Sequence, residues 1–483
     1  MKSTKCLSPL LTAEVKISMG EGNDKLEVEG NIIGGRYQFD MGNGNNIIHI
    51  KKSVNDTVNL VLSFGDGNDL LRVDKNFDGQ KNINFGEGQN KLVARDLLMG
   101  NNNSINYGSG DDVLLVSNRL AGNSGAIDMG DGNNTVKVGG NFNGTVGGRG
   151  SITTGEGNDV FRFNGSVNGD ITAGAGEDSI RIDNDLSGGT IDTGAKATDT
   201  VASDNDYIRI DGTAGALTNA ISINTAAQEG YQGTDDDTVR IDSDAYGNIT
   251  VGGGNDTIQI GGIYRGDIEA SSGDNSITID GTFQTGSITT GDGVDTIQID
   301  GDLANITTNS PSVITGAGND SLTIGGEVRS GRIDMGDGDD VLYIQGPTRK
   351  GMSDNSIDMG AGDDTVMLQG GNETYYAKHF QNVNTFDMTE DTKQTLELQI
   401  DDILNDDVEE LFIKGDDLDV VDLGANGNGL SDNKIGRENG VWSQKNELHT
   451  DSEGNTYHAY IFTGNDGSVN NEIVYIQDVI TVI

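Results

Sequence analysis

The chain of 483 residues has one cysteine, three prolines and one tryptophan, and the lack of cysteine and of long apolar runs excludes several structures. Cys6 has no second cysteine, so an intrachain disulfide and a cysteine-based zinc site are both excluded. No stretch approaches the roughly 18 apolar residues of a membrane helix. The run from Leu7 to Leu11 is too short for the apolar core of a secretory signal. We therefore expect no membrane insertion, and no cleaved N-terminal signal if the protein leaves the cell.

Basic residues are also scarce, with 31 Lys and Arg against 77 Asp and Glu and a formal charge of −46. A compact chain with that charge repels itself unless cations neutralise it. Nucleic acid and anionic membranes are therefore poor partners, and metal cations are good ones. The 73 glycines would also suit a flexible low-complexity chain, but the regular apolar spacing argues against disorder.

A short motif recurs along the chain: Gly-x-Gly-x-(Asp/Asn)-x-apolar-x-apolar. We call its Asp or Asn the anchor, and anchors follow one another at intervals of 19 to 31 residues. The sixteen anchors are Asp24, Asn46, Asp69, Asn90, Asp112, Asn134, Asp159, Asp178, Asp206, Asp237, Asp256, Asn275, Asp295, Asp320, Asp340 and Asp364. Thirteen motifs keep both glycines, whereas those at Asp206, Asp237 and Asn275 are degenerate.

The apolar positions of the motif predict strands. Residues two and four after each anchor are apolar, as Leu26 and Val28 are, and this alternation places them on one face of a strand. One repeat cannot bury that face alone, but stacked repeats form a continuous core. We predict an all-β fold, a β-roll-like parallel β-solenoid of about 16 coils of 20–25 residues over 15–371. Residues 1–14 lead into it, 372–392 form a linker or cap, and 393–483 form a small C-terminal β domain. Extra residues near 195–203 and 224–231 should bulge from the turn edge.

The turn chemistry points to calcium. Glycine permits positive φ, which lets backbone carbonyl oxygens turn inward beside the anchor carboxylate. Calcium takes 6–8 oxygen ligands from carboxylates and carbonyls, more than one turn supplies, so each ion should lie between two stacked turns. The turn glycines that we take as candidates are Gly20, Gly22, Gly65, Gly67, Gly155, Gly157, Gly316, Gly318, Gly336, Gly338, Gly360 and Gly362. The alternative is that these residues simply form good turns without a metal.

Motifs such as Gly155-Glu-Gly-Asn-Asp159 and Gly316-Ala-Gly-Asn-Asp320 resemble the calcium-binding nonapeptide of RTX β-roll proteins. The resemblance covers about 350 residues and implies that the anchor aspartates ligate calcium. The family usually opens the motif with a third glycine, where this chain has residues such as Met41 or Phe64. Only one motif occurs per coil, so we expect calcium along one edge. Asparagine anchors lack the charge, so their sites should be weakly occupied or use an aspartate from a neighbouring coil.

The C-terminal region resembles the target domain of large adhesins exported by type I secretion. The resemblance rests on Leu398-x-x-Asp401-Asp402-Ile403-Leu404, on Gly440-Val-Trp442 and on the apolar tail from Val474 to Ile483. It implies an uncleaved export signal at the C-terminus, a type I exporter as partner, and an extracellular or cell-surface location. The alternative is a cap that covers the last solenoid edge.

The motifs His-Glu-x-x-His and Gly-x-Ser-x-Gly are both absent, so a zinc protease and a lipase are disfavoured and we expect no enzyme. The leading hypothesis is a secreted structural or adhesive protein of the bacterial surface. A self-assembling surface-layer or matrix protein is one alternative. A polysaccharide-binding or polysaccharide-modifying solenoid is another.

Three residues after the anchor, four consecutive coils place an arginine on the outward face. The row consists of Arg162, Arg181, Arg209 and Arg240. Pairing with neighbouring aspartates such as Asp183 is one interpretation, and a site for an acidic or host-surface glycan is the other.

Overall fold

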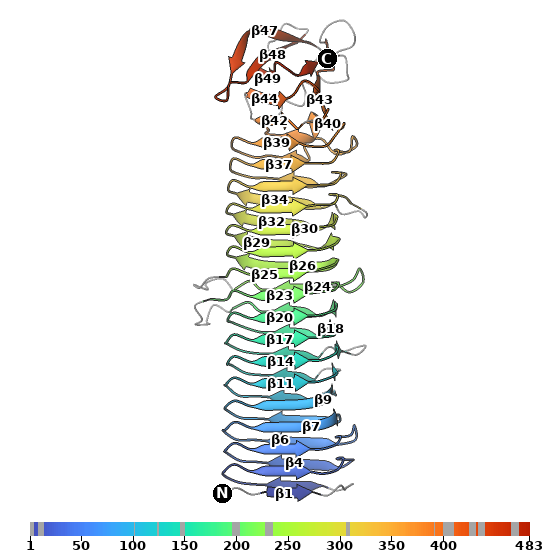
Figure 1. Ribbon diagram of the computed structural model, residues 1–483, viewed down its shortest axis with the longest axis vertical. Helices are drawn as coiled ribbons and strands as arrows, with labels where there is room; N and C mark the ends of the chain where they lie inside the picture. Colours follow the sequence, from blue (N-terminus) through green and yellow to red (C-terminus); the bar gives the residue numbers. More distant parts are fainter. Residues whose placement is uncertain are drawn as a thin grey trace. The chain divides into compact units, whose positions relative to one another are not determined.

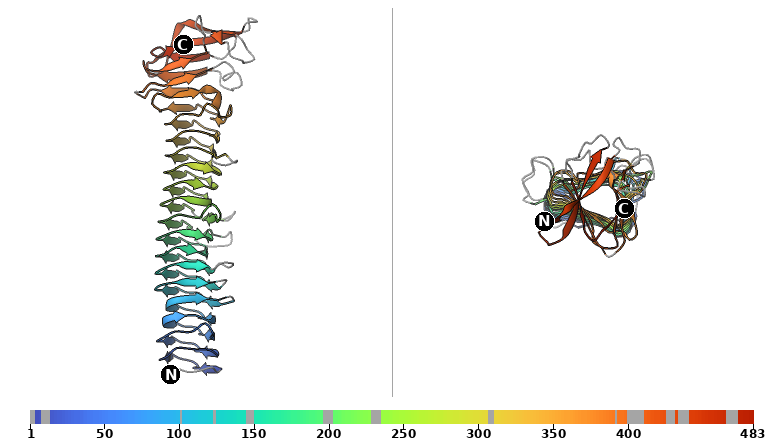
Figure 2. Two further views of the ribbon diagram at one scale, coloured as in Figure 1. Left: turned by 90° about the vertical axis from the view of Figure 1, so that its right-hand side faces the viewer. Right: turned by 90° about the horizontal axis from the view of Figure 1, so that it is seen from above.

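The computed structural model describes residues 4–7, 14–100, 102–122, 125–144, 150–195, 203–227, 235–305, 310–390, 392–398, 410–424, 431–432, 440–464 and 473–483. The chain divides into two compact units, residues 1–257 and 258–483, and the division falls within β27 (Thr257–Ile260). Within each unit, strands of successive coils pair in parallel (Figures 1 and 2). The predicted all-β parallel solenoid is confirmed, with about 17 coils over the described residues.

In the first unit, each coil places one strand directly after its anchor and a second strand across the core. The first kind, which we call anchor strands, comprises β3 (Lys25–Val28), β5 (Ile47–Ile50), β7 (Leu70–Phe77), β9 (Lys91–Met99), β11 (Val113–Val116), β14 (Thr135–Val138), β17 (Val160–Phe163), β20 (Ser179–Ile182), β23 (Tyr207–Ile210) and β25 (Thr238–Ile241). β1 (Thr4–Leu7) pairs in parallel with β3. The opposite strands are β2 (Val15–Ser18), β4 (Arg36–Asp40), β6 (Asn59–Ser63), β8 (Gln80–Asn84), β10 (Ser104–Asn106), β13 (Ala126–Asp128), β16 (Ser151–Thr153), β19 (Asp170–Thr172), β22 (Thr190–Asp192), β24 (Ile221–Asn224) and β26 (Ala245–Gly253). Four short strands follow anchor strands at the next corner: β12 (Leu120–Gly122), β15 (Phe142–Gly144), β18 (Val167–Asn168) and β21 (Leu186–Gly188).

The second unit repeats this arrangement. Its anchor strands are β30 (Ser276–Ile279), β33 (Thr296–Ile299), β35 (Ser321–Ile324), β37 (Val341–Ile344) and β39 (Thr365–Leu368). Across the core lie β29 (Ile268–Ser272), β32 (Ser287–Asp292), β34 (Ser312–Ala317), β36 (Arg332–Asp334), β38 (Ile357–Asp358) and β41 (Phe380–Gln381), and the short corner strands are β28 (Tyr264–Arg265) and β31 (Phe283–Thr285).

The predicted inward positions form the core. Leu26 and Val28 are 0% and 4% exposed, and the corresponding residues of later coils are buried in the same way. The position that is glycine in the RTX motif also points inward, and there the rings of Phe64, Phe85 and Tyr107 stack with centroids 5.0 and 4.5 Å apart. Side chains therefore fill the core beneath each turn, where the third glycine would leave space.

Parallel pairing continues past residue 371, where the motif spacing ends. β42 (Thr385–Met388) pairs with β39, β44 (Glu410–Gly415) pairs with β42, and β49 (Ile473–Gln477) pairs with β44. A second parallel sheet contains β40 (Thr374–Tyr376), β43 (Thr395–Glu397), β45 (Val420–Asp422) and β50 (Thr481–Val482). Antiparallel pairing is confined, among the described strands, to the bridge between Ala216 and Asn219 and to β46 (Ser431–Asp432), β47 (Gly440–Thr450), β48 (Thr456–Gly464) and β49.

Trp442 packs in this C-terminal region: it is 3% exposed and meets the ring of Phe462 edge-on, with the ring centroids 5.4 Å apart. Of the residues expected to bulge or to mark the export domain, 196–202, 228–231 and 401–404 lie outside the described residues. The described part of the chain has one 3₁₀ helix, η1 (Ala377–His379), and contains no helix with the length and hydropathy that a membrane span requires.

Candidate metal centre

The anchors line one corner of the coils, and their side chains turn inward. Every anchor is at most 2% exposed. Oδ1 of one anchor accepts a hydrogen bond from the backbone N–H of the anchor one coil earlier, as Asp178 does from Asp159 at 2.8 Å. The same contact, at 2.5 to 3.1 Å, joins successive anchors from Asp24 to Asp256 and from Asn275 to Asp364. We call this row the anchor ladder.

The anchor ladder explains the residue types of the motif. Only Asp and Asn place an acceptor oxygen at this distance from the backbone together with a second polar atom on the same carbon. Asp206 and Asp237, whose motifs are degenerate, occupy the ladder like the others. The ladder also extends one coil beyond the motif, because Oδ1 of Asn384 accepts from the backbone N–H of Asp364 at 2.9 Å. The motif search missed Asn384 because no Gly-x-Gly precedes it.

At asparagine anchors the second polar atom has partners within its own turn. Nδ2 of Asn46 donates to the carbonyl oxygens of Gly42 and Gly44 at 2.9 and 2.7 Å. Asn90 and Asn134 make the same two contacts with their glycines, at 2.9 to 3.2 Å, and Asn275 makes one of them at 2.9 Å. The amide thus gives the second polar atom of the anchor partners within its own turn in a buried corner.

At aspartate anchors the second polar atom is an oxygen, which cannot donate to those carbonyls while the carboxyl group is ionised. Among the described contacts, Oδ2 is buried and has no hydrogen-bond partner at ten anchors: Asp69, Asp112, Asp159, Asp178, Asp206, Asp237, Asp295, Asp320, Asp340 and Asp364. Transferring an unpaired charged oxygen from water into the protein interior costs roughly several kcal/mol, unless a proton or a cation compensates the charge. The aspartate turns therefore need a positive partner that the asparagine turns do not need.

The electrostatics of the aspartates agree with that need. Burial raises the pKa of Asp69 to about 6 and that of Asp112 to about 7. The shift is larger at Asp178, Asp206 and Asp237, which follow one another in the ladder. Burial, together with the charge of Asp178, raises the pKa of Asp206 to about 10, and the pKa of Asp237 is likewise raised to about 10 by burial and by Asp206.

Two further carboxyls lie near these last anchors, at positions that the Gly-x-Gly motif does not include. Asp204 and Asp235 stand two residues before their anchors, where other coils have the second glycine. Asp204 is 0% exposed and accepts from the backbone N–H of Gly176 at 2.8 Å. Asp235 is 8% exposed. An Asp-x-Asp sequence at the anchor spacing was the signal that could have identified them.

The predicted turn glycines serve two different purposes. Ten of the twelve have positive φ, as Gly22 and Gly362 do at 122° and 150°. The prediction of positive φ is wrong for Gly65 and Gly155, which are outside the left-handed region. Glycine is needed there for space, because a Cβ atom would collide with a side-chain oxygen of the preceding coil, that of Asn43 at Gly65 and that of Asp131 at Gly155.

The donor set fits a hard cation such as calcium. No three His, Cys, Asp or Glu side chains among the described residues gather closely enough to hold a metal by themselves. Backbone carbonyls would therefore supply most ligands, which calcium accepts and soft metals do not. In a turn such as that of Asp112, the residues that would hold the ion are Asp112 through Oδ2 and Gly108 and Gly110 through their carbonyl oxygens, with the neighbouring turn. At Asn46, Asn90, Asn134 and Asn275 the amide already donates to a carbonyl oxygen of this kind. The weak occupancy expected of these anchors stays a prediction.

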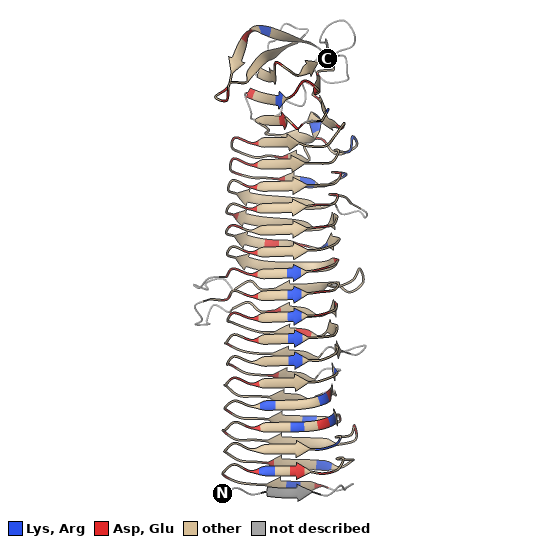
Figure 3. Ribbon diagram, in the orientation of Figure 1, with Lys and Arg blue, Asp and Glu red and all other residues tan. Residues whose placement is uncertain are grey.

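The outward arginines form ion pairs within the solenoid, as one of the two interpretations held. Nε of Arg181 lies 2.7 Å from Asp183, and one of its terminal nitrogens lies 2.8 Å from Asp211. Arg209 pairs in the same way with Asp211 at 2.6 Å and with Asp242 at 2.8 Å. Nε of Arg240 contacts Asp242 at 2.5 Å, and Arg162 approaches Asp183 at 3.3 Å. These arginines appear as a vertical row of blue segments over β17 to β25 in Figure 3.

Comparison with known proteins adds one structural neighbour. No protein-family model and no curated protein matches the chain. One solved structure is similar: a hyperactive, Ca²⁺-dependent, β-helical antifreeze protein from an Antarctic bacterium, at 19% identity and a TM-score of 0.38. The match covers 65% of this chain and 80% of that protein. The calcium dependence belongs to that protein, and for this chain the case for calcium rests on the anchor contacts.

The raised pKa values predict how stability varies with pH in the absence of calcium. The pKa of Asp112 rises from 3.8 to about 7 on folding, so the folded chain binds protons more tightly than the unfolded chain. The free energy of unfolding in chelator should therefore be greatest at or below about pH 4 and fall as the pH rises to about 7. Saturating calcium should compensate the ionised carboxylates, so its stabilising effect should grow over the same range. Thermal unfolding at about pH 5 and about pH 8, with chelator and with calcium, measures both trends. Greater stability in chelator at the higher pH would contradict the assignment.

Exchanging an aspartate anchor for asparagine should remove the proposed cation ligand while it keeps the hydrogen bond of the anchor ladder. Asp112→Asn keeps Oδ1 in the ladder and supplies an amide that can donate to Gly108 and Gly110. We expect this variant to be more stable than the wild type in chelator, by about 1–3 kcal/mol, because a buried unsatisfied group is removed. It should also gain less from calcium. The matched control, Asn134→Asp, should be less stable in chelator and gain more from calcium. Equal responses of both variants to calcium, measured by thermal unfolding, would exclude anchor-bound ions.

Proposed function

We propose that the protein is a secreted, calcium-stabilised β-solenoid with a structural or adhesive role at the bacterial cell surface. The observation that supports it most directly is the row of buried anchor carboxylates whose Oδ2 atoms have no partner among the described residues. The ions would be held by the anchor aspartates, including Asp24 and Asp256, and by glycine carbonyls of the turns. When bound, calcium would neutralise the buried charge and join neighbouring turns.

An extracellular location fits the need for calcium. Extracellular modules bind calcium with Kd values of about 10⁻⁴–10⁻³ M, a range matched by the medium around cells rather than by cytosol. The single cysteine is consistent with a protein that replaces disulfides by metal as its cross-link. For export we propose a type I exporter that recognises the C-terminal region, on the basis of the motifs from Leu398 to Ile483.

The repeat architecture suits a structural role better than catalysis. Contacts in a solenoid join nearest neighbours, so the fold offers a long, uniform surface rather than a single cleft. We therefore propose a non-enzymatic protein. Self-assembly into a surface layer or matrix is the alternative if calcium drives association of whole chains in addition to folding.

Calcium should govern the folding of the chain. We expect circular dichroism to change from largely disordered in chelator to β-rich in calcium, with a midpoint near ~10⁻⁴–10⁻³ M. Magnesium at equal concentration is the control, since it requires near-ideal octahedral geometry and keeps its own water, so it should substitute poorly. A complete β signal in chelator would refute calcium-dependent folding. Sedimentation at the same calcium concentrations should show a monomer for an adhesin and calcium-dependent assemblies for a surface-layer protein.

Export should depend on the C-terminal region. Deleting residues 393–483 should abolish secretion in a host with a compatible type I exporter, and fusing them to a passenger should confer it. The control is the same deletion in a chain given a conventional N-terminal signal, which should still leave the cytoplasm. Normal secretion of the truncated chain through the type I exporter would refute the proposed route.

A further inference from the structure

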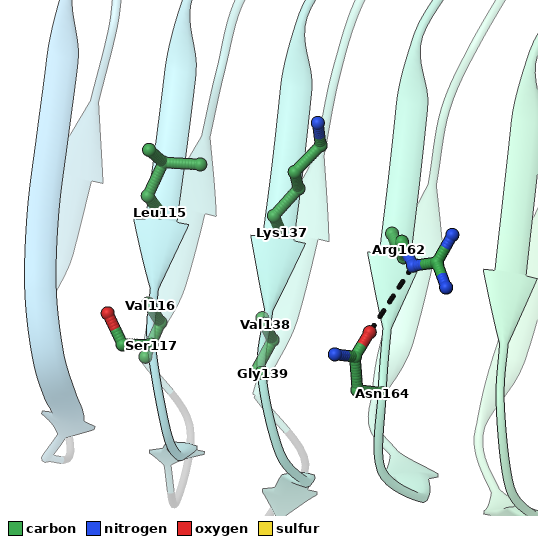
Figure 4. A pocket seen from close by; sticks show the side chains of 8 residues that line it. All are labelled: Leu115, Val116, Ser117, Lys137, Val138, Gly139, Arg162 and Asn164. Carbon is green, nitrogen blue, oxygen red and sulfur yellow. Dashed lines mark hydrogen bonds between the residues drawn. The ribbon is translucent and has the colours of Figure 1, made fainter.

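A pocket of about 390 Å³ opens on the outward face of three consecutive anchor strands, β11, β14 and β17. Leu115, Lys137 and Arg162 pair in register across these strands, so their side chains follow one another along the row that continues into Arg181. Ser117, Gly139 and Asn164 complete the lining at the ends of the strands (Figure 4). The pocket thus lies at the N-terminal end of the arginine row.

The two cations of the pocket are not neutralised as the later arginines are. Lys137 makes no hydrogen bond or ion pair within the described part of the chain. Arg162 has two contacts of 3.3 Å, one to Asn164 and one to Asp183. Arg181, by comparison, holds two carboxylates at 2.7 and 2.8 Å.

The cause is visible in the sequence. Two residues after each of the later arginines stands an aspartate, as Asp183 follows Arg181. At this register position β14 and β17, the two pocket strands that carry a cation, have Gly139 and Asn164 instead. The aspartates that pair with the later arginines two residues before them therefore have no counterpart on the pocket strands. The carboxylate of a ligand can take their place.

The surroundings favour an anion as well. The outward positions of the three strands hold Val113, Leu115, Thr135, Lys137, Val160 and Arg162. None of them is acidic, in a chain whose formal charge is −46. An anion approaching this part of the sheet meets two adjacent positive charges, and low ionic strength strengthens that attraction.

The lining also selects among anions. Arginine presents a planar fork that matches a carboxylate, and lysine adds a point charge beside it. The half-buried Leu115 offers an apolar surface to the C–H face of a sugar ring, while Ser117 and Asn164 can hydrogen-bond ring hydroxyls. The volume lies within the range of small-ligand sites, about 300–1,000 Å³, and exceeds the needs of a bare inorganic anion.

We propose that this pocket binds the carboxylate and ring of an acidic sugar, a uronate residue of a glycan. The proposal depends on the proposed surface role for the source of its ligand, but its contacts do not involve the calcium turns. It also places the ligand at Lys137 and Arg162 rather than at the paired Arg181, Arg209 and Arg240.

Calorimetry with trigalacturonic acid at low salt and fixed saturating calcium tests the site on the whole chain. Lys137→Gln combined with Arg162→Gln should weaken binding roughly 10- to 100-fold, because two charged hydrogen-bond donors are lost. Arg209→Gln is the matched control in the paired part of the row and should bind like the wild type. Asn164→Asp is isosteric and supplies the carboxylate that closes the row elsewhere, so it should also weaken binding while leaving the fold intact.

Three results would overturn the proposal. The first is that the wild type does not bind trigalacturonic acid, and the second is that the double variant and Asn164→Asp bind it as tightly as the wild type does. The third is that the wild type binds the methyl-esterified trisaccharide as tightly as the free acid. Displacement by inorganic sulfate at the same concentration as trigalacturonic acid would overturn the sugar assignment. Thermal unfolding of each variant in calcium checks folding independently. Retained sugar binding by a chain that shows no calcium response would refute the calcium proposal and leave this site standing.

Discussion

The structure depends on one hydrogen bond repeated along a buried corner, from Asp24 to Asp256 and again from Asn275 to Asp364: the backbone N–H of one anchor donates to Oδ1 of the anchor in the next coil. A backbone N–H buried at a corner must find an acceptor, and the turn offers none of its own. The anchor side chain supplies it across the gap between coils. Because the contact repeats from coil to coil, it aligns the anchors, and the anchor strands that follow them pair in the same register.

The second atom of the anchor then divides the coils into two kinds. The amide of an asparagine anchor donates to the glycine carbonyl oxygens of its own turn. The carboxylate of an aspartate anchor instead directs its second oxygen, Oδ2, into the same buried corner. The ladder thus remains the same throughout, while the electrostatic demand changes from coil to coil. In residues 24–159 the two kinds alternate, and from Asp159 to Asp256 every anchor is an aspartate. Burial and the repulsion between neighbouring carboxylates then act together, and they raise the pKa of Asp206 to about 10.

Much of this arrangement could be predicted from the sequence because spacing alone determines it. Period-two alternation after each anchor identified the strands and the core, and recurrence every 19 to 31 residues identified the stack. The ladder was not predicted, since nothing in a linear motif shows that Asp and Asn share one acceptor contact between coils. The role of Gly65 was missed for a related reason: it is set by the side chain of Asn43 in the preceding coil. Asp204 and Asp235 were not predicted as candidate ligands because the motif has glycine at their position, two residues before the anchor.

The interchangeable anchors also bear on how such a chain can change over generations. Codons for asparagine and aspartate differ by a single nucleotide, and both residues maintain the ladder. A point mutation at Asn134 or Asp112 therefore alters the charge of one turn without changing the contact that aligns its coil. Selection can in this way adjust the buried charge of a stack one coil at a time while the register of the coils is kept.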